Sequence, residues 1–320
     1  MRYIVYGAGG IGGVVGGRLS QAGHDVVLIA RGAHAAAIRE AGLRVESPDA
    51  SDVLRLPVVE HPRELRFDAD DVALIAVKGQ DSAAALDALA LAAPVDLPTV
   101  CLQNGVANEE LALRHFRNVY AVPVLCPTGH LQPGIVVAYS SPVTGIFDIG
   151  RYPSGVDDRA SAISGDLAAA TFSSVARPDV MRWKWAKLLA NLANSIEAIC
   201  GPIGNESRLV PLVRAEGEAA LRAAGIDFAS ADEDRERRGD LLSIRPVEGQ
   251  RRGGGSSWQS LARGVGSIES DYLNGEIVLL GRRHGVPTPV NEVLQRTANR
   301  LAAERIPPGT MTEDDVLALR

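Results

Sequence analysis

A glycine pattern set between two apolar runs at the amino terminus constrains the fold of this chain most strongly. The run Tyr3–Tyr6 has the composition of a short buried strand, and a G-x-G-x-x-G follows it at residues 7–12. A helical stretch to about Gly23 and a second apolar run at 26–30 complete a strand–helix–strand unit. In a dinucleotide site the first glycine permits a tight turn, the second lets the backbone approach a pyrophosphate, and the third lets helix and strand pack closely. The residues predicted to surround the cofactor are Gly7, Ala8, Gly9, Gly10, Ile11 and Gly12.

The residue after the second strand indicates which dinucleotide the site prefers. An Asp or Glu there would accept hydrogen bonds from a free ribose 2′-hydroxyl, whereas this chain has Arg31. A guanidinium makes charge-assisted, often bidentate bonds to a phosphate, so Arg31 predicts NADP(H). Three glycines at this spacing also occur in turns that bind no ligand, and the motif alone leaves that alternative open.

The composition of the chain limits its size class and its partners. With 320 residues, 46% of them hydrophobic, the chain can bury one large core or two ordinary ones. A net charge of −6 without a block of like charge argues against nucleic acid or an anionic membrane as the main partner. No apolar run approaches the roughly 18 residues of a membrane span. The amino terminus leads directly into the glycine loop, so we expect no signal peptide.

The cysteines and histidines predict neither disulfides nor a metal site. Cys101, Cys126 and Cys200 are odd in number and widely spaced, as expected of reduced thiols in a cytoplasmic protein. The 6 histidines form no H-x-x-x-H or similar pair, so we predict no metal-binding residues.

Strands alternate with helices through the first half of the sequence. Strand-like runs are expected at 2–6, 26–30, 43–46, 72–77, 98–102 and 118–122, and helices at about 11–22, 33–41, 80–92 and 106–115. This alternation is typical of right-handed strand–helix–strand units and a parallel sheet. Two further runs, 135–139 and 145–149, have no helix between them and are expected to form an antiparallel edge.

The pattern changes after Pro178. Helix-period segments are expected at about 180–200, 206–224, 231–243, 258–263, 267–284 and 289–305, with no convincing strand among them. We therefore predict an α/β fold, with a Rossmann-type NADP(H)-binding domain at 1–177 and an all-helical substrate and catalytic domain at 178–320. The charged run 232–238 is interpreted as a solvated helix face without a function.

Two polar residues follow strands of the predicted sheet. Lys78 comes after the run 72–77, and Asn104-Gly105 comes after the run 98–102. Open α/β sheets bind their ligands at the carboxyl ends of the strands, so Lys78 and Asn104 are candidates to contact ribose, phosphate or substrate. Alternatively, Lys78 is a solvated loop residue and Asn104-Gly105 is only a turn.

The stretch 181–195 carries polar residues along one side of an expected helix. At about 100° per residue, Asn191 and Asn194 lie within roughly 40° of Lys187, and Lys184 and Ser195 fall on the same side. Asparagine is a mediocre helix former, so a stripe of this kind indicates a binding surface. A solvated amphipathic face is the alternative.

Two later segments hold further candidates. Residues 251–258 contain three consecutive glycines, which mark a flexible or tightly turned loop, followed by Ser257 and Trp258. A disordered surface loop is the alternative. Glu269 lies near the start of the helix expected from residue 267, where an acid could equally serve only to favour the helix start.

Together these regions resemble the ketopantoate reductases, also called 2-dehydropantoate 2-reductases, over nearly the whole chain. The motifs of that family are matched by the glycines at 7, 9 and 12 with Arg31, by Lys78, by Asn104-Gly105, by Lys187-Leu188-Leu189-Ala190-Asn191, by Ser257 with Glu269 twelve residues on, and by Gly285–Asn291. The combination is much more specific than any one of these motifs.

The resemblance implies the NADPH-dependent reduction of a 2-oxo acid, 2-dehydropantoate, to pantoate in pantothenate biosynthesis. It implies that Lys187 protonates the carbonyl oxygen as hydride arrives, that Asn191 orients the substrate and that Ser257 bonds its far end. Glu269 would contact the cofactor ribose and the lysine, so Lys187 and Glu269 are the catalytic candidates. The resemblance places Lys78, Asn104 and Glu269 at the cofactor, and Asn104, Asn191, Asn194, Ser195 and Ser257 at the substrate.

The sequence departs from the family at two places that concern the substrate. The second asparagine of the family, four residues after the first, is Ser195 here, and Asn194 precedes it. The family's S-M-x-Q-D reads Ser257-Trp258-Gln259-Ser260-Leu261. The alternatives are therefore a reductase of the same family that acts on a different 2-oxo acid or ketone, and an NADPH-binding sensor without turnover. The sequence leaves the oligomeric state open, a homodimer included.

Overall fold

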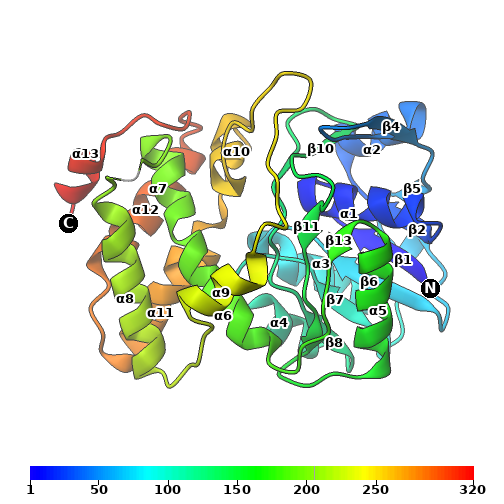
Figure 1. Cartoon of the computed structure of the whole chain (residues 1–320), viewed down its shortest axis with the longest axis horizontal. Coiled ribbons are helices and arrows are strands. Elements are labelled where there is room, and N and C mark those ends of the chain that lie inside the picture. The colour runs from blue at the N-terminus through cyan, green and yellow to red at the C-terminus, as the bar shows by residue number, and fades with distance from the viewer. Residues whose placement is uncertain (205) are drawn as a thin grey trace. The chain divides into compact units, whose positions relative to one another are not determined.

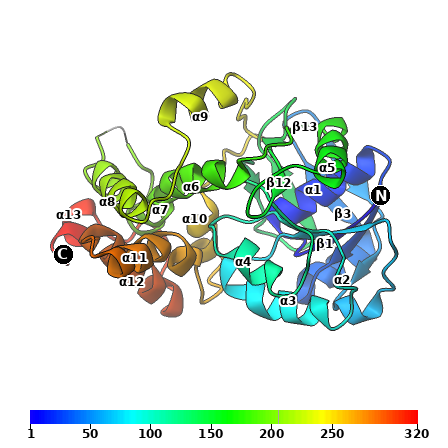
Figure 2. The same ribbon diagram turned by 90° about the horizontal axis from the view of Figure 1, so that it is seen from below.

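Seven strands form the main sheet, in the order β12-β8-β7-β6-β1-β2-β5. Figure 1 labels all of them except β12, which is labelled in Figure 2. The computed structural model describes residues 1–204 and 206–320. Neighbouring strands of this sheet run parallel, except β12 with β8. The strands are β1 (Arg2–Tyr6), β2 (Asp25–Ile29), β5 (Val58–Val59), β6 (Asp71–Ile75), β7 (Thr99–Cys101), β8 (Val119–Ala121) and β12 (Gly150–Arg151).

Helices cover both faces of this sheet because its central strands are apolar on both sides. In β1, Tyr3 and Val5 pack into one hydrophobic cluster, and Ile4 and Tyr6 into another. The first cluster includes residues of α1 (Gly10–Gln21), α2 (Gly32–Ala41) and α5 (Asp158–Ala169). The second includes residues of α3 (Ser82–Ala90) and α4 (Asn108–Leu113), and Figure 2 shows α5 and α3 on opposite sides of the strands. The near-continuous apolar runs read from the sequence are thus those of a doubly covered parallel sheet.

A second sheet of four strands corrects one expectation. It has the order β4-β3-β10-β9 and is made of β3 (Leu43–Glu46), β4 (Ser51–Leu54), β9 (Thr128–Gly129) and β10 (Ile135–Ala138). The runs 135–139 and 145–149 do not form an antiparallel edge together, so that prediction is wrong. β10 pairs with β3 and β9, while β11 (Gly145–Ile146) pairs in parallel with β13 (Phe172–Ser173).

The pairing of β10 follows from packing on α1. Val136 is fully buried and lies against Gly13, where a Cβ would be 2.7 Å from a methyl group of Val136. The strand is thus held over the helix by contacts that are remote in sequence. The local pattern of apolar residues does not contain that information.

The described residues after 178 contain helices and no strand of these sheets. The expected helix 180–200 is two helices, α6 (Val180–Asn191) and α7 (Ala193–Cys200), and the segment 267–284 is a 3₁₀ helix, η3 (Glu269–Tyr272), followed by α11 (Asn274–His284). The others are α8 (Leu209–Ala223), α9 (Ala231–Arg238), α10 (Ser256–Ala262), α12 (Pro289–Ala303) and α13 (Glu313–Leu317). The predicted fold class, an α/β domain followed by a helical region, is confirmed.

The chain folds into two compact units, and their limits in the sequence cannot be predicted from the sequence pattern. One unit contains Met1–Gln103, Ala107–Lys184 and Asp232–Arg252, and the other contains Asn104–Val106, Trp185–Ala231 and Gly253–Arg320. The domain limits 1–177 and 178–320 remain a prediction, but they assign the segment 232–252 to the helical part. In the structure this segment belongs to the first unit.

Ion pairs explain the place of the segment 232–252. Arg237 is 13% exposed and binds both carboxylate oxygens of the buried Asp148, at 2.6 and 2.9 Å. Arg182 binds the carboxylate of Glu233 through two bonds of 2.7 and 2.8 Å. The interpretation of 232–238 as a solvated helix face is therefore incomplete: α9 has no buried residue, but two of its charged side chains attach this run to the first unit.

Within the described residues, no helix combines the length and the apolar character that a membrane span requires.

Candidate functional site

The glycine loop joins β1 to α1 through a turn that excludes side chains at two positions. Gly7 has φ +100°, and a Cβ there would lie 2.8 Å from the backbone nitrogen of Val77. A Cβ on Gly12 would lie 2.1 Å from the carbonyl oxygen of Gly7 and 2.9 Å from the Cβ of Ala76. A side chain at either position would force the loop away from the sheet.

Gly9 differs from these two glycines because its α-carbon faces open space. It is the N-cap residue of α1, its helix has no side-chain cap, and the first turn holds no acidic residue. Among the described residues, a Cβ on Gly9 would meet one heavy atom within 4 Å, the Cδ2 of His130 at 3.9 Å. The amino terminus of α1 therefore offers backbone N–H groups beside a space that a phosphate can occupy.

This loop lies where the strand order of the main sheet reverses. β1 has β2 on one side and β6 on the other, so that Tyr6 is opposite both Ile29 and Ile75. Lys78 follows β6 as the N-cap of a short 3₁₀ helix, η2 (Gly79–Asp81), and is half-buried. Open α/β sheets bind ligands at such a switch point, beyond the carboxyl ends of the strands. The structure thus brings Lys78 to the same edge of the sheet as the glycine loop.

Arg31 lies at this edge too, as the N-cap residue of α2, and its side chain is exposed. Its charge acts on Tyr6 at the end of β1. Burial raises the pKa of the Tyr6 hydroxyl, and the guanidinium of Arg31 opposes that rise. A guanidinium in this place is available to a phosphate that extends beyond β2.

A buried ion pair fixes the turn that follows β7. The ammonium of Lys184, 2% exposed, binds the fully buried carboxylate of Glu109 and donates to the carbonyl oxygen of Gln103 at 3.1 Å. The side-chain amide of Gln103 donates to the carbonyl oxygen of Val77 at 2.8 Å. Lys184 is therefore committed within the first unit. The prediction that it shares a binding stripe with Lys187 is wrong. The helical periodicity predicts the direction of the Lys184 side chain, but it cannot predict that Glu109 lies in that direction.

Asn191 and Asn104 are brought together at the other end of α6. Nδ2 of Asn191 donates to Oδ1 of Asn104 at 2.9 Å, and Asn191 is only 4% exposed. Lys187 lies one helical turn earlier and is half-buried. Asn191 is thus buried and bonded to a second amide, so the solvated amphipathic face that the sequence left open as the alternative does not apply to this residue.

Ser195 and Asn194 have different surroundings. The hydroxyl of Ser195 is fully buried and donates to Oδ1 of Asn274 at 2.6 Å. Asn274 in turn donates to the carbonyl of Leu192 and to Asn291, at 3.1 and 3.0 Å. Ser195 therefore belongs to a polar network that joins helices, and this geometry gives no support to a direct substrate contact. Asn194 is partly exposed and remains a candidate.

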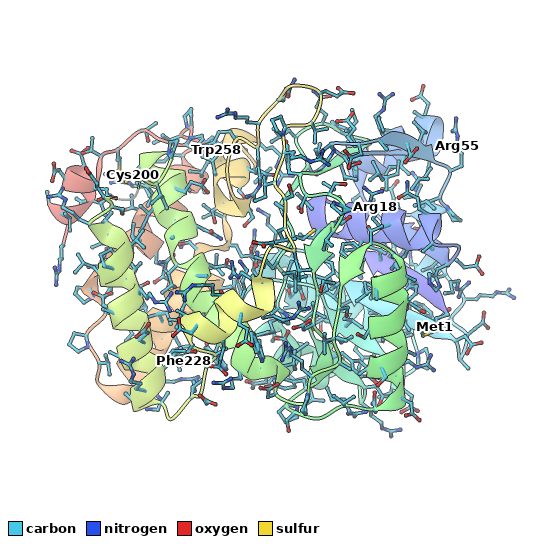
Figure 3. The ribbon with its side chains drawn as sticks, in the orientation of Figure 1. Met1, Arg18, Arg55, Cys200, Phe228 and Trp258 are labelled. Atoms are coloured by element: carbon cyan, nitrogen blue, oxygen red, sulfur yellow. The ribbon has the colours of Figure 1, made fainter. Side chains whose placement is uncertain are left out.

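The three consecutive glycines form a packed support for Ser257 rather than a loose loop. A Cβ on Gly254 would lie 2.5 Å from the indole of Trp258, and one on Gly253 would lie 2.9 Å from the same ring. Trp258 itself is labelled in Figure 3. The backbone N–H of Gly255 donates to the carboxylate of Glu197 on α7 at 2.7 Å. Trp258 is larger than the methionine that the family has at this position. Its indole fits because Gly253 and Gly254 have no side chains.

The hydroxyl of Ser257 is buried and has no hydrogen-bond partner among the described residues. Leaving a buried hydroxyl unpaired costs free energy, which a bound polar ligand would recover. Glu269, the first residue of η3, is 4% exposed. Leu261, where the family has an aspartate, is 3% exposed in α10.

Sequence reasoning missed three residues that support the candidates. Gln103 and Glu109 hold the turn that carries Asn104, and Glu197 holds the backbone before Ser257. For Gln103, its position next to the candidate Asn104 is the one feature of the sequence that could have indicated a supporting role. Glu109 and Glu197 look like ordinary helix acids in the sequence, since their roles depend on partners 75 and 58 residues away.

A doubly wound parallel sheet with a glycine loop at its switch point defines the class of dinucleotide-binding α/β proteins. Within that class, the chain belongs to the ketopantoate reductase PanE/ApbA family. The family model described as ketopantoate reductase PanE/ApbA matches residues 3–153, and the model of its C-terminal part matches residues 179–302. The protein is therefore an oxidoreductase of this family.

Individual relatives agree with this assignment. The chain is 30% identical over 302 residues to a 2-dehydropantoate 2-reductase of Archaeoglobus fulgidus, covering 92% of this chain and 95% of the relative. The crystal structure of a PanE/ApbA family ketopantoate reductase from Ralstonia eutropha is similar, with a TM-score of 0.79, 28% identity, and coverage of 95% and 99%. A ternary structure of D-mandelate dehydrogenase with NADH and anilino(oxo)acetate shares the fold, with a TM-score of 0.81, 20% identity and the same coverage.

Proposed function

We propose that this protein is an NADPH-dependent reductase of a 2-oxo acid, with 2-dehydropantoate as its substrate and pantoate as its product. The observation that carries the proposal is the hydrogen bond between the buried Asn191 and the half-buried Asn104, one helical turn from Lys187 in a chain of this family. The curated relatives with 27–30% identity over at least nine tenths of the chain are named 2-dehydropantoate 2-reductases.

The residues of the first unit fit a dinucleotide. Gly9 leaves space at the amino terminus of α1, Lys78 lies on the same sheet edge, and the exposed Arg31 supplies a charge for a 2′-phosphate. When bound, a reduced nicotinamide supplies the hydride. NADPH is preferred in this proposal because a 2′-phosphate gives Arg31 a charged partner that NADH lacks.

Lys187 is the acid of the proposed reaction. Reduction of the carbonyl places negative charge on its oxygen, and an ammonium both neutralises that charge and donates the proton. Glu269 is the second catalytic candidate, because a carboxylate buried in η3 can hold and orient an ammonium.

The polar groups around Lys187 would bind the substrate. Asn191 and Asn104 present amide groups that orient the 2-oxo acid, and Asn194 adds a further partly exposed amide. The hydroxyl of Ser257, which has no hydrogen-bond partner among the described residues, would bond the end of the substrate that lies away from the reacting carbonyl.

Trp258 and Leu261 favour a second candidate, a reductase of the same family for another 2-oxo acid or ketone. The indole of Trp258 fills the space above Gly253 and Gly254, and Leu261 is buried where the family has a carboxylate. Both differences adjoin Ser257, which the proposal places at the far end of the substrate.

The test is an assay of NADPH oxidation at about 340 nm with 2-dehydropantoate and a panel of other 2-oxo acids and ketones. The highest kcat/KM identifies the substrate. Stoichiometric NADPH binding without oxidation across the panel would favour a sensor instead. In the same assay, Lys187→Ala should lower kcat by roughly 10²–10⁴ and NADPH affinity much less.

Lys187→Arg is the matched control for the role of Lys187. It keeps the positive charge, but a guanidinium does not give up its proton in proteins. Both variants should therefore be slow if Lys187 donates the proton, whereas only Lys187→Ala should be slow if the site needs charge alone. Lys184 does not serve as a control, because it is buried against Glu109. Near-normal turnover of Lys187→Ala would overturn the mechanism.

A further inference from the structure

Strand β9 and the residue that follows it, His130, lie beside the glycine loop, and two of their side chains approach it. Oγ1 of Thr128 would lie 3.0 Å from a Cβ on Gly10, and Cδ2 of His130 would lie 3.9 Å from a Cβ on Gly9. Residues 128 and 130 share one face of an extended chain, since side chains alternate along a strand. The imidazole of His130 therefore borders the space in front of Gly9.

A hydrogen bond fixes which edge of the His130 ring faces that space. Nδ1 of His130 lies 3.0 Å from the carbonyl oxygen of Ile135. A carbonyl oxygen only accepts, so Nδ1 carries a hydrogen. The opposite side of the ring, where Cδ2 is bonded to Nε2, is the side that lies toward Gly9.

His34 holds both the glycine loop and the ring of His130. Its Nε2 lies 2.7 Å from the carbonyl oxygen of Ala8, and its Nδ1 accepts from the backbone N–H of Gly134 at 2.9 Å. The ring centroids of His34 and His130 are 4.3 Å apart at an interplanar angle of 53°. His34 thus links the glycine loop to the segment that precedes β10, and its ring packs against the imidazole of His130.

We propose that His130 is a further ligand of the dinucleotide, at its pyrophosphate, and that His34 is the positioning residue for this contact. The inference rests on the proposed function and extends it to residues outside the glycine motif. A pyrophosphate at the start of α1 lies where Gly9 leaves space, which is the space that His130 borders. The negative charge of the pyrophosphate favours a hydrogen on Nε2 of His130, and this N–H then donates to a phosphate oxygen.

The two cofactors distinguish this contact from that of Arg31. NADPH and NADH share the pyrophosphate and differ in the 2′-phosphate, so loss of His130 should weaken both equally. Loss of Arg31 should weaken NADPH alone. ADP carries a pyrophosphate and AMP does not, so the two are competitor probes of the same contact.

Two amide substitutions separate the binding role from the structural one. In His130→Asn, the side-chain amide can replace Nδ1 and keep the bond to Ile135, but nothing reaches the position of Nε2. In His130→Gln, the amide reaches the position of Nε2. The dissociation constants of NADPH and NADH are measured by nucleotide fluorescence, together with the thermal unfolding midpoint.

We expect His130→Asn to weaken NADPH and NADH by about tenfold or more, to weaken ADP but not AMP, and to leave the unfolding midpoint near that of the wild type. His130→Gln should stay within about threefold of the wild type for both cofactors. His34→Phe should weaken both cofactors and raise the KM for NADPH more than it lowers kcat, because the glycine loop is displaced but no reacting group is lost.

Other results would overturn this inference or the proposed function. If His130→Asn binds both cofactors like the wild type while the wild type turns over, this inference is overturned and the proposed function stands. If both amide variants lose cofactor affinity equally and have a lowered unfolding midpoint, His130 has a purely structural role, and the inference is overturned too. A wild-type protein that binds neither dinucleotide overturns the proposed function as well.

Discussion

Arg31 occupies the place where a dinucleotide site distinguishes a 2′-hydroxyl from a 2′-phosphate. It is the last residue before α2, its side chain is exposed, and its charge acts on Tyr6 at the neighbouring strand end. An exposed guanidinium without a fixed geometry contributes little to folding. Its effect should therefore appear in binding rather than in stability.

Arg31→Ala should cost on the order of 1–3 kcal/mol of NADPH affinity and leave NADH affinity nearly unchanged. The reason is that only NADPH carries the phosphate that the guanidinium would contact. Titration of both cofactors by fluorescence measures the two losses side by side. Equal losses would mean that Arg31 does not contact the 2′-phosphate.

Gly9 and Gly12 offer a matched pair of alanine substitutions. A Cβ fits at Gly9 without a contact closer than 3.9 Å, whereas at Gly12 it would lie 2.1 Å from a backbone oxygen. Gly9→Ala should keep the wild-type free energy of unfolding and lose dinucleotide affinity, because the methyl group fills the space left for the pyrophosphate. Gly12→Ala should lower the free energy of unfolding by about 1–3 kcal/mol or more. Urea unfolding with cofactor titration tests both, and an unaffected affinity in Gly9→Ala would contradict the phosphate site.

Helix α6 shows what a helical pattern can and cannot predict. The apolar positions Leu188 and Leu189 are buried, as is Leu192 directly after the helix, as their spacing indicates. Lys184 and Lys187 lie on one side of the same wheel, yet Lys184 is an internal ion-pair partner of Glu109. Periodicity predicts the direction of a side chain, and the partner found in that direction comes from a distant part of the chain.

The pair of Lys184 and Glu109 gives a prediction at the scale of elements, since it joins α6 to α4. Lys184→Met leaves a carboxylate buried without its counter-charge and should lower the free energy of unfolding by about 3–5 kcal/mol. Adding Glu109→Gln removes that charge, so the double variant should recover much of the loss. Urea unfolding curves measure both. A single variant as stable as the wild type would show that the carboxylate is not confined as the structure indicates.

For the whole molecule, the sequence predicted the fold class because that depends on local alternation of strands and helices and on one glycine motif. It did not predict that the segment 232–252 joins the first unit, because that depends on bonds from Arg237 to Asp148 and from Arg245 to Asp49. The candidates Asn191 and Asn104 could be named from motifs. Their bond to each other could not, since it joins residues 87 positions apart.

The three thiols report on the integrity of both units. Burial raises the pKa of Cys126 to about 12 and that of Cys200 to about 11, and it raises the pKa of Cys101 well above its ordinary value. Cys126 also donates a hydrogen bond to the carbonyl oxygen of Thr144 at 3.3 Å. Cys101 and Cys126 belong to the first unit. Cys200, labelled in Figure 3, ends α7 in the second unit.

Native protein should therefore react slowly with a thiol reagent at about pH 8. The thiolate is the reactive form, and a raised pKa reduces it: at this pH a group with a pKa of about 12 is roughly 10⁻⁴ ionised, against roughly a tenth for the ordinary value of 9.0. Labelling rates followed across a urea titration should rise only where the protein unfolds, and all three thiols should react at once in denatured protein. Mass spectrometry assigns each modified cysteine. A thiol that reacts in native protein as fast as free cysteine would contradict its raised pKa, and its position would identify the unit that opens.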